Sequence, residues 1–233
     1  MVISASDISV IIPAINEQDN IAGAVESALG AGAGEVWVAD GGSTDSTIEY
    51  AGQAGALVCC GDAGRAVQQN NGAKHATKTI LCFLHADNRL GSAALQQAAI
   101  YFSEDATNRW SCFYQNIEAK GIGYSLLQWG NAWRARWSGR VYGDQAITIT
   151  RELFEVIGGF PEVDLMEDVL LSKILRRLGL RPCVLDGPVK ISARRWIKKG
   201  ILRQTLSNWW LLLQLRLGTK PNQLAKHYRR HDG

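Results

Sequence analysis

Short, largely apolar runs alternate with amphipathic segments through the first half of the chain. The runs fit strands that are buried on both faces, and the segments between them repeat apolar residues every three or four positions, as a helix does. The predicted strands cover 8–12, 35–39, 56–60 and 79–85, and the predicted helices cover 18–30, 65–76 and 92–102, with one more helix capped by Ser43 or Thr44. Repeated strand–helix units of this length predict a mostly parallel central sheet with helices on both faces.

The second half of the chain is less regular, but it still contains both strand-like apolar runs and segments with helical spacing of apolar residues. The predicted strands cover 110–117 and 145–150, and the predicted helices cover 124–137, 151–157, 166–178 and 198–217. We therefore expect an α/β protein with amphipathic helices at its C-terminus. We place a domain boundary after Trp196, with an α/β domain in 1–196 and a basic helical extension in 197–233.

Composition excludes several classes of protein. The 233 residues are 46% hydrophobic and 20% charged, which is ordinary for a globular domain and argues against disorder, collagen and coiled coil. The five cysteines form no C-x-x-C pair, and no signal peptide precedes them, so a reducing, cytoplasmic setting is favoured over a disulfide framework or a structural zinc site. No apolar run approaches the roughly 20 residues that a membrane span needs.

Basic residues are concentrated near the C-terminus. The net charge is only +3, yet residues 190–233 hold 11 Lys and Arg against one acidic residue. Such a tail suits a polyanionic partner, such as a phosphate-rich substrate or a membrane surface, or else it is a solvated helix face. No nucleic-acid-reading motif accompanies the tail, so nucleic acid is not an expected partner.

Polar residues follow each of the four predicted strands of the first half. Ligands of open α/β sheets bind beyond the carboxyl ends of the strands, so these residues are the candidates for a functional site. They are 13–17 after the first strand, Asp40 after the second, 61–66 after the third and 85–87 after the fourth. Acidic side chains gathered there repel each other unless a divalent cation or Arg65 joins them.

Three of these side chains have a definite chemical use. Asp40 can accept hydrogen bonds from a uracil-type base or from ribose hydroxyls, and capping of the next helix accounts for 43–45 but leaves Asp40 without a role. Asp87 can hold Mg²⁺ or Mn²⁺ together with substrate phosphates. His85 can add an imidazole ligand, which Mn²⁺ accepts, or it is an ordinary histidine at a strand end.

Two further motifs lie in the second half. Glu167 and Asp168 open a predicted helix, where acidic side chains suit the helix dipole, and Asp168 can alternatively serve as a general base. Residues 192–196 (SARRW) place two arginines beside Trp196. Each guanidinium can contact two phosphate oxygens at once, and the indole offers a flat apolar surface to a sugar or lipid. Taken alone, neither motif establishes a function.

The order of the motifs carries more weight than any one of them. The segments are VIIPAINEQDNI (10–21), VADGGSTDST (38–47), GRAVQQNNGA (64–73), FLHADN (83–88), GDQAITITRELFEVIGGFPE (143–162), LMEDVLLSKILRRLG (165–179) and SARRW (192–196). In this order, over residues 8–196, the chain resembles family 2 glycosyltransferases, whose GT-A fold binds nucleotide-diphospho-sugars. Its HAD, GDQA and RRW forms are similar to those of a small bacterial subgroup, the radical-SAM/selenodomain-associated transferases.

The resemblance implies roles for individual residues. Those implied to bind the donor are Pro13, Asn16, Glu17, Asp40, Arg65 and Asp87, of which Asp87 is also the last position of the family's Asp-x-Asp metal motif. Asp168 is implied to be the general base, and those implied to contact the diphosphate or the acceptor are Gly143, Asp144, Gln145, Glu167, Arg195 and Trp196. The chain departs from the pattern at His85, which replaces the first Asp of the metal motif, and at Ser192, which replaces the Gln of the Gln-x-x-Arg-Trp motif and argues against processive polymer synthesis.

The activity implied by the resemblance is a metal-assisted, inverting transfer of a sugar from a nucleotide-diphospho-sugar, foremost a UDP-sugar, to an acceptor hydroxyl. Mn²⁺ or Mg²⁺ is the expected cofactor. A sugar-1-phosphate nucleotidyltransferase is disfavoured, because residues 13–17 stand where such enzymes carry a Gly-rich basic loop. The other alternative is a non-catalytic module that binds a nucleotide-sugar or a membrane surface.

Residues 196–217 combine basic residues with a stripe of large apolar ones. The stripe consists of Ile201, Leu202, Leu206, Trp209, Trp210, Leu213 and Leu217. We expect it to pack against the α/β domain or in a homodimer interface, as apolar stripes at helical spacing usually do. The alternative is a helix that lies on the inner face of an anionic membrane and meets a lipid-linked acceptor there.

Overall fold

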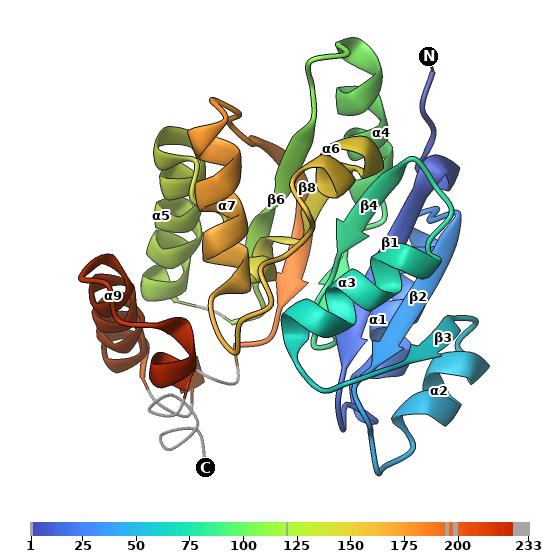
Figure 1. Cartoon of the computed structure of the whole chain (residues 1–233), viewed down its shortest axis with the longest axis horizontal. Coiled ribbons are helices and arrows are strands. Elements are labelled where there is room, and N and C mark those ends of the chain that lie inside the picture. Colours follow the sequence, from blue (N-terminus) through green and yellow to red (C-terminus); the bar gives the residue numbers. More distant parts are fainter. Residues whose placement is uncertain (1, 120, 194–195, 198–199, 226–233) are drawn as a thin grey trace.

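The structure is a computed structural model that describes residues 2–119, 121–193, 196–197 and 200–225. These residues form an eight-stranded sheet with helices on both faces (Figure 1). The strands are β1 (Ile8–Ala14), β2 (Glu35–Asp40), β3 (Leu57–Cys60), β4 (Ile80–Phe83), β5 (Asn88–Leu90), β6 (Trp110–Ile117), β7 (Ile147–Thr150) and β8 (Cys183–Ile191). The helices are α1 (Ile21–Gly30), α2 (Thr47–Gln53), α3 (Arg65–His75), α4 (Ala94–Glu104), α5 (Ile122–Ser138), α6 (Arg151–Val156), α7 (Glu167–Arg177) and α9 (Ile201–Arg216), with 3₁₀ turns at Ala5–Asp7 and Gly143–Gln145.

The strands of the first half form a parallel block in the order β3-β2-β1-β4. β7 is antiparallel to both β4 and β6, β8 is parallel to β6, and β5 pairs antiparallel with β8 at the far edge. The predicted α/β fold is confirmed, and the second half adds antiparallel strands to the parallel block. Because β1, β2 and β4 run the same way, their carboxyl ends share one edge of the sheet, where the polar loops meet.

Strand β1 shows how the sheet divides the core in two. Its residues alternate, so that Ile8, Val10 and Ile12 face one side and Ile11 faces the other, all of them fully buried. Helices α1, α2 and α4 cover the first side, and α3, α5, α6 and α7 contribute to the second. Burial on both faces explains why β1 is an almost unbroken apolar run in the sequence.

The hydrophobic pattern did not predict β5 and β8. Pro188, which has no backbone N–H, interrupts β8, and the pairing of β8 with β6 shifts register between Phe113 and Gln115. Residues 186–188 therefore leave the ladder as a bulge, although the strand continues beyond them. β5 is only three residues long, so its pairing partner defines it rather than its own sequence.

Helix α2 begins later than the sequence predicted. Its first residue is Thr47, which is buried, and the residue before it is Ser46. The prediction that Ser43 or Thr44 caps this helix is wrong, because Ser43 instead donates its hydroxyl to Asp40. Residues 41–46 are thus a loop at the carboxyl edge of the sheet.

Candidate active site

The loops that follow β1 and β2 are tied to one another by hydrogen bonds. The amide of Asn16 donates to Ser43 Oγ at 3.0 Å, and the amide of Thr44 donates back to Asn16 Oδ1 at 2.8 Å. The amide of Glu17 donates to Thr47 Oγ1 at 2.8 Å. Asn16 has a φ of 51°, a left-handed conformation that asparagine tolerates better than most residues. The two loops therefore form one continuous polar rim.

Asp40, at the end of β2, is buried and holds its own loop in place. Its Oδ2 accepts the amides of Gly42 and Ser43 at 2.8 and 2.9 Å, and its Oδ1 accepts the hydroxyl of Ser43. Gly42 has a φ of 94°, which a residue with a side chain rarely adopts. Asp40 therefore has the structural role that the sequence analysis did not find for it.

Gln68 of α3 joins the ends of β1 and β2 from beneath. Its side chain is buried, and Nε2 donates to the carbonyl oxygens of Ala14 at 2.7 Å and Ala39 at 2.9 Å. Both carbonyls lie at the carboxyl ends of their strands, and that of Ala14 also accepts from the amide of Gly41 at 3.0 Å. The sequence analysis missed this residue, because a polar residue inside an amphipathic helix carries no signal that it is buried.

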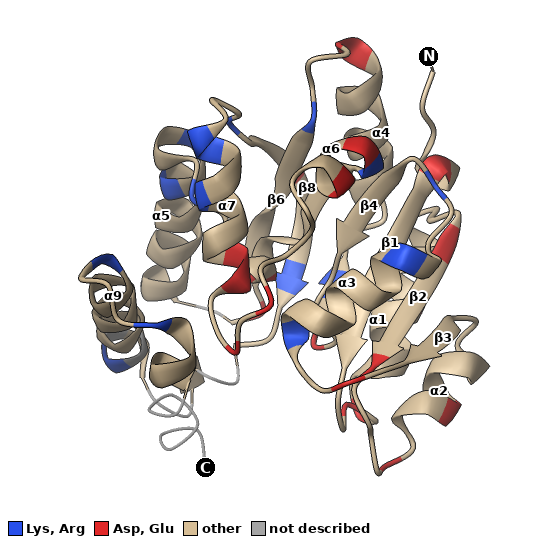
Figure 2. Ribbon diagram, in the orientation of Figure 1, with Lys and Arg blue, Asp and Glu red and all other residues tan. Residues whose placement is uncertain are grey.

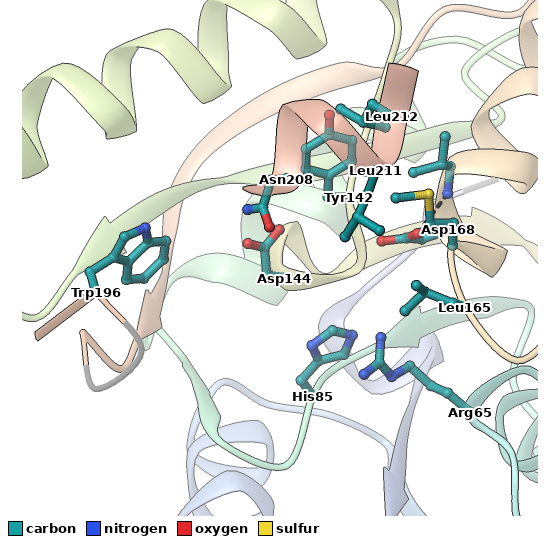
Figure 3. Close-up of a pocket in the computed structure, with 12 residues that line it drawn as sticks. Arg65, His85, Tyr142, Asp144, Leu165, Asp168, Trp196, Asn208, Leu211 and Leu212 are labelled. Atoms are coloured by element: carbon teal, nitrogen blue, oxygen red, sulfur yellow. Dashed lines mark hydrogen bonds between the residues drawn. The ribbon is translucent and has the colours of Figure 1, made fainter. Parts of the chain in front are cut away.

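A cavity of about 180 Å³ lies beyond these strand ends, on the side of α7 and α9 (Figure 3). It brings together five residues that the sequence singled out: Arg65, His85, Asp144, Asp168 and Trp196. They come from five separate segments of the chain and carry two carboxylates, a guanidinium, an imidazole and an indole. A single concave site with these groups can bind a polar, anionic ligand and move a proton.

Two backbone amides fix the carboxylate of Asp168. Gly143 N donates to Oδ2 at 2.5 Å, and Val169 N donates to Oδ1 at 2.7 Å. Gly143 lies so close that a Cβ added to it would stand 2.6 Å from His85 Nε2. The turn at Gly143–Gln145 therefore sets the position of a side chain on α7, and the site depends on glycine at 143.

The neighbouring acid, Glu167, has a different environment. Its side chain is 2% exposed, and Oε1 pairs with Arg65 Nη1 at 3.3 Å. Burial raises the pKa of Glu167, the nearby Arg65 opposes that rise, and the charge of Asp168 adds to it. Glu167 thus serves to hold Arg65 at the cavity, while Asp168 lines the cavity itself.

The structure places the remaining predicted residues outside the lining of this cavity. Pro13, Asn16, Glu17 and Asp40 form the rim at the ends of β1 and β2. Asp87 is half-buried, two residues beyond His85 and close to the charge of Arg89. Arg195 lies outside the described residues.

Gln145 was expected on the acceptor side, and the structure gives it an internal role. It is fully buried, and its Oε1 accepts a hydrogen bond from Arg134 Nη2 at 2.9 Å and one from the amide of Tyr142 at 3.3 Å. Its side chain does not reach the cavity lining. Gln145 therefore braces the turn that carries Gly143 and Asp144.

Helix α9 supplies a wall of the cavity that the sequence analysis did not anticipate. Asn208, Leu211 and Leu212 enter it from this helix, opposite Arg65 and His85 (Figure 3). Leu211 is buried, but it does not belong to the predicted stripe, of which Leu206, Trp209, Trp210, Leu213 and Leu217 are 49–71% exposed. The prediction that this stripe packs against the α/β domain is wrong for these five residues, and the homodimer alternative stays a prediction. The apolar pattern pointed to a different face of α9 from the one that lines the cavity. Tyr142, which precedes the GDQ turn, also lines the cavity.

The candidate metal ligands of the protein suit an ion that is bound together with a substrate. Across the described part of the chain, no three His, Cys, Asp or Glu side chains are gathered into a group that could hold a metal. Mg²⁺ and Mn²⁺ bind through one or two protein carboxylates when substrate phosphates supply the other ligands. Of the two candidates that follow β4, His85 lines the cavity and Asp87 does not, so together they offer one imidazole and one carboxylate rather than a complete protein cage.

Sequence comparison assigns most of the chain to one family. The model of the family described as glycosyl transferase family 2 matches residues 9–158, which is more than half of the chain. No match was found among curated proteins.

Solved structures share the fold at low identity. A mannosyltransferase from Pyrobaculum calidifontis, in complex with GDP-Man and Mn²⁺, is 20% identical over 79% of this chain and 56% of its own, with a TM-score of 0.61. Residues 1–349 of TarS from S. aureus, in complex with UDP-GlcNAc, are 18% identical over 79% and 58%, with a TM-score of 0.62. Glucosyl-3-phosphoglycerate synthase from Mycobacterium tuberculosis, with Mn²⁺, UDP and glucosyl-3-phosphoglycerate, is 20% identical over 78% and 70%, with a TM-score of 0.56. The chain spans less than two thirds of the first two, and at these identities the likeness establishes the GT-A fold.

Proposed function

The chain belongs to glycosyl transferase family 2, and we propose that it transfers a sugar from a nucleotide-diphospho-sugar to an acceptor hydroxyl. One observation carries the proposal: Asp168 and Arg65 line the same cavity at the carboxyl edge of the sheet. The carboxylate is held by two backbone amides and the guanidinium by a buried glutamate. A fixed base beside a fixed cation is what a transfer that moves a proton and releases a diphosphate requires.

Asp168 acts as the general base in this proposal. Its carboxylate takes the proton of the acceptor hydroxyl as the hydroxyl oxygen attacks the anomeric carbon of the donor sugar. The new carbon–oxygen bond forms as the bond to the diphosphate breaks, and the electron pair of that bond leaves with the diphosphate. A single displacement of this kind inverts the anomeric configuration. The amides of Gly143 and Val169 keep the carboxylate in one orientation, which lowers the entropic cost of reaching the reactive geometry.

The donor occupies the other side of the site. The rim formed by the loops after β1 and β2, with Asn16 and Glu17, faces the nucleoside, for which uridine is the first candidate. Arg65 lies toward the diphosphate, whose negative charge its guanidinium stabilises. A divalent ion, when bound, supplies further positive charge for the departing diphosphate, and Asp87 with His85 would hold it.

Turnover of the Asp168→Asn variant tests the proposal. Asparagine keeps the size of the side chain and can still accept from Gly143 N, but it cannot take a proton at neutral pH. We expect release of nucleoside diphosphate from UDP-, GDP- and dTDP-sugars to fall by about 10²-fold or more, with donor binding retained in a thermal-shift assay. The matched control is Asp164→Asn, an exposed carboxylate of the loop that precedes α7, which should turn over normally.

Other outcomes identify the alternatives. Turnover of Asp168→Asn near the level of the unmodified protein excludes Asp168 as the base. Donor binding without turnover in the unmodified protein points to a binding module. Formation of a nucleotide-sugar from a nucleoside triphosphate and a sugar 1-phosphate would identify a nucleotidyltransferase.

A further inference from the structure

A second cavity, of about 410 Å³, opens between α5 and α9. It shares one wall with the first cavity, because Tyr142, Asp144, Trp196, Asn208 and Leu212 line both. The two cavities therefore meet at Asp144. A molecule held between α5 and α9 extends along this wall to the site of the proposed transfer.

Three arginines line the second cavity: Arg134, Arg140 and Arg216. Arg134 stacks on the ring of Tyr142, with its Cζ 3.6 Å from the ring centroid, and donates only to neutral oxygens. Within the described residues, none of the three arginines forms an ion pair with a carboxylate. Burial lowers the pKa of Arg140, and the guanidiniums of Arg216, Arg176 and Arg134 lower it further. A cluster of like charges in a cavity wall is stabilised by an anionic ligand.

Apolar side chains line another part of the second cavity, and this apolar surface continues outward along α9. Leu127 of α5 and Trp209, Leu212 and Leu213 of α9 line the cavity. Beyond it, the exposed face of α9 carries Leu206, Trp209, Trp210, Leu213 and Leu217, which are 49–71% exposed. An apolar chain that leaves the cavity therefore meets more apolar surface rather than water.

Helix α5 presents a matching face. Ile122, Leu126, Trp129, Trp133 and Trp137 are 81%, 63%, 64%, 52% and 70% exposed. At 100° per residue these five positions fall within about 80° of the helix circumference, so they form one stripe. Tryptophan is enriched where proteins meet the headgroup region of a bilayer, because its ring is apolar and its N–H is polar. Figure 1 shows α5 and α9 as neighbours beyond one end of the sheet.

Charge distinguishes a membrane from a second copy of the chain as the partner of these faces. Neither α5 nor α9 contains Asp or Glu, and both carry arginine (Figure 2). Arg136 of α5 pairs with Asp186, but neither helix offers a carboxylate of its own. In a symmetric dimer the same patch meets itself, so the other arginines of α5 and α9 would approach one another without carboxylates from the facing helices. An anionic lipid surface supplies the opposite charge and accepts the apolar side chains as well.

We propose that the cavity between α5 and α9 is the acceptor site for a membrane lipid whose headgroup carries a phosphate and a free hydroxyl. The arginines bind the phosphate, the hydroxyl extends past Asp144 toward Asp168, and the acyl chains pass along Trp209 and Leu213 into the bilayer. The exposed faces of α5 and α9 lie on the bilayer surface. This inference rests on the proposed glycosyl transfer for the role of the bound lipid, but not for the binding itself.

Co-sedimentation of the full chain with vesicles tests the binding. Phosphatidylglycerol is the probe, because its headgroup has both a phosphate and hydroxyls. We expect the protein to sediment with vesicles of phosphatidylcholine that contain phosphatidylglycerol and to stay in solution with phosphatidylcholine alone. Replacing two arginines together, Arg140→Gln with Arg216→Gln, should weaken binding by about thirtyfold, since each basic residue near an anionic surface changes the affinity about fivefold.

Apolar contact is tested separately. The pair Trp129→Ser with Trp133→Ser changes only exposed side chains and should reduce vesicle binding at least tenfold. Matched controls are Arg181→Gln, an exposed arginine elsewhere, and Val156→Ser, which replaces a side chain that is 75% exposed on α6; both should bind vesicles and release nucleoside diphosphate normally. The proposal is overturned if either paired variant binds vesicles as tightly as the unmodified protein. It is also overturned if the unmodified protein binds vesicles of phosphatidylcholine alone as well as vesicles that contain phosphatidylglycerol.

Two further measurements separate this proposal from neighbouring ones. Soluble dihexanoyl phosphatidylglycerol should accept sugar in place of the vesicle lipid, whereas glycerol phosphate should not; equal use of both overturns the role of the apolar walls. If the unmodified protein forms a stable dimer and does not bind vesicles, the exposed faces of α5 and α9 serve self-association, and the proposal is overturned. If the unmodified protein releases no nucleoside diphosphate, glycosyl transfer is refuted. Vesicle binding is measured without a nucleotide-sugar, so its result tests the lipid site independently of glycosyl transfer.

Discussion

The pair of Arg65 and Glu167 allows a quantitative test of how the site is held. Arg65→Ala removes the partner of a carboxylate whose side chain is 2% exposed, while Arg65 itself is 42% exposed. A hydrogen bond to a charged group contributes about 1.5–3 kcal/mol, and the exposure of Arg65 places its contribution near the lower end, at about 1.5 kcal/mol. For a chain of this length that corresponds to a melting temperature roughly 3–6 °C lower.

Dependence on pH shows whether the unpaired charge causes this loss. Because burial raises the pKa of Glu167, the folded chain binds its proton more tightly than the unfolded chain, so stability falls as the pH rises from the unfolded pKa through the folded pKa. Removing Arg65 raises the folded pKa further. The variant should therefore lose more stability at pH 8 than at pH 5, where Glu167 is closer to its neutral form.

Urea unfolding of four proteins measures the effect: the unmodified chain, Arg65→Ala, Glu167→Gln and the double variant. Glu167→Gln removes the buried charge and keeps an acceptor for Arg65, so its stability should match or exceed that of the unmodified chain. Arg65→Ala should then cost less than about 0.5 kcal/mol in the Glu167→Gln background. An equal loss in both backgrounds, or an equal loss at both pH values, would refute the assignment of Glu167 as the anchor of Arg65.

Three further outcomes follow from local geometry. Gly143→Ala introduces a Cβ 2.6 Å from His85 Nε2 and should lower turnover by about 10²-fold with donor binding retained; normal kinetics would contradict the close approach. Gln68→Leu removes one donor each from the carbonyls of Ala14 and Ala39, of which Ala14 keeps the amide of Gly41, and should destabilise the fold by roughly 2 kcal/mol in urea unfolding. No change in the free energy of unfolding would contradict this. Iodoacetamide should label exposed Cys60 in the folded chain and Cys82 only after unfolding, because burial raises the pKa of Cys82 to about 12. Peptide mass spectrometry measures the labelling, and modification of both cysteines in the folded chain would contradict the prediction.

The sequence predicted the first half of the fold well because β1 and β4, its central strands, are buried on both sides. β1 and β4 are continuous apolar runs, and the helices between the parallel strands have clear amphipathic spacing. β8 was missed because its partners lie far away in the chain and because Pro188 and Gly187 resemble a turn in isolation. Pairing over long sequence separation leaves no local signature.

The candidate site was predictable to the extent that it lies at strand ends. That rule found Arg65 and His85, and the family motif found Asp168, all of which line the first cavity. The rule did not show that Asp40 uses its carboxylate within its own turn, because two backbone amides and a nearby hydroxyl are not visible in a residue pattern. Nor could it find Asn208, whose place depends on where α9 packs.

The manner in which α9 is attached has a consequence for how this protein could diversify. Among the side chains of α9 that the structure describes, Leu211 alone is buried, although Asn208 and Leu212 also line the first cavity. In the described part of the chain, no helix is both long and apolar enough to cross a bilayer. Under the proposed function, substitutions on the exposed face of α9 would alter which second substrate is accepted, while the sheet and the side chains of Arg65 and Asp168 stay in place.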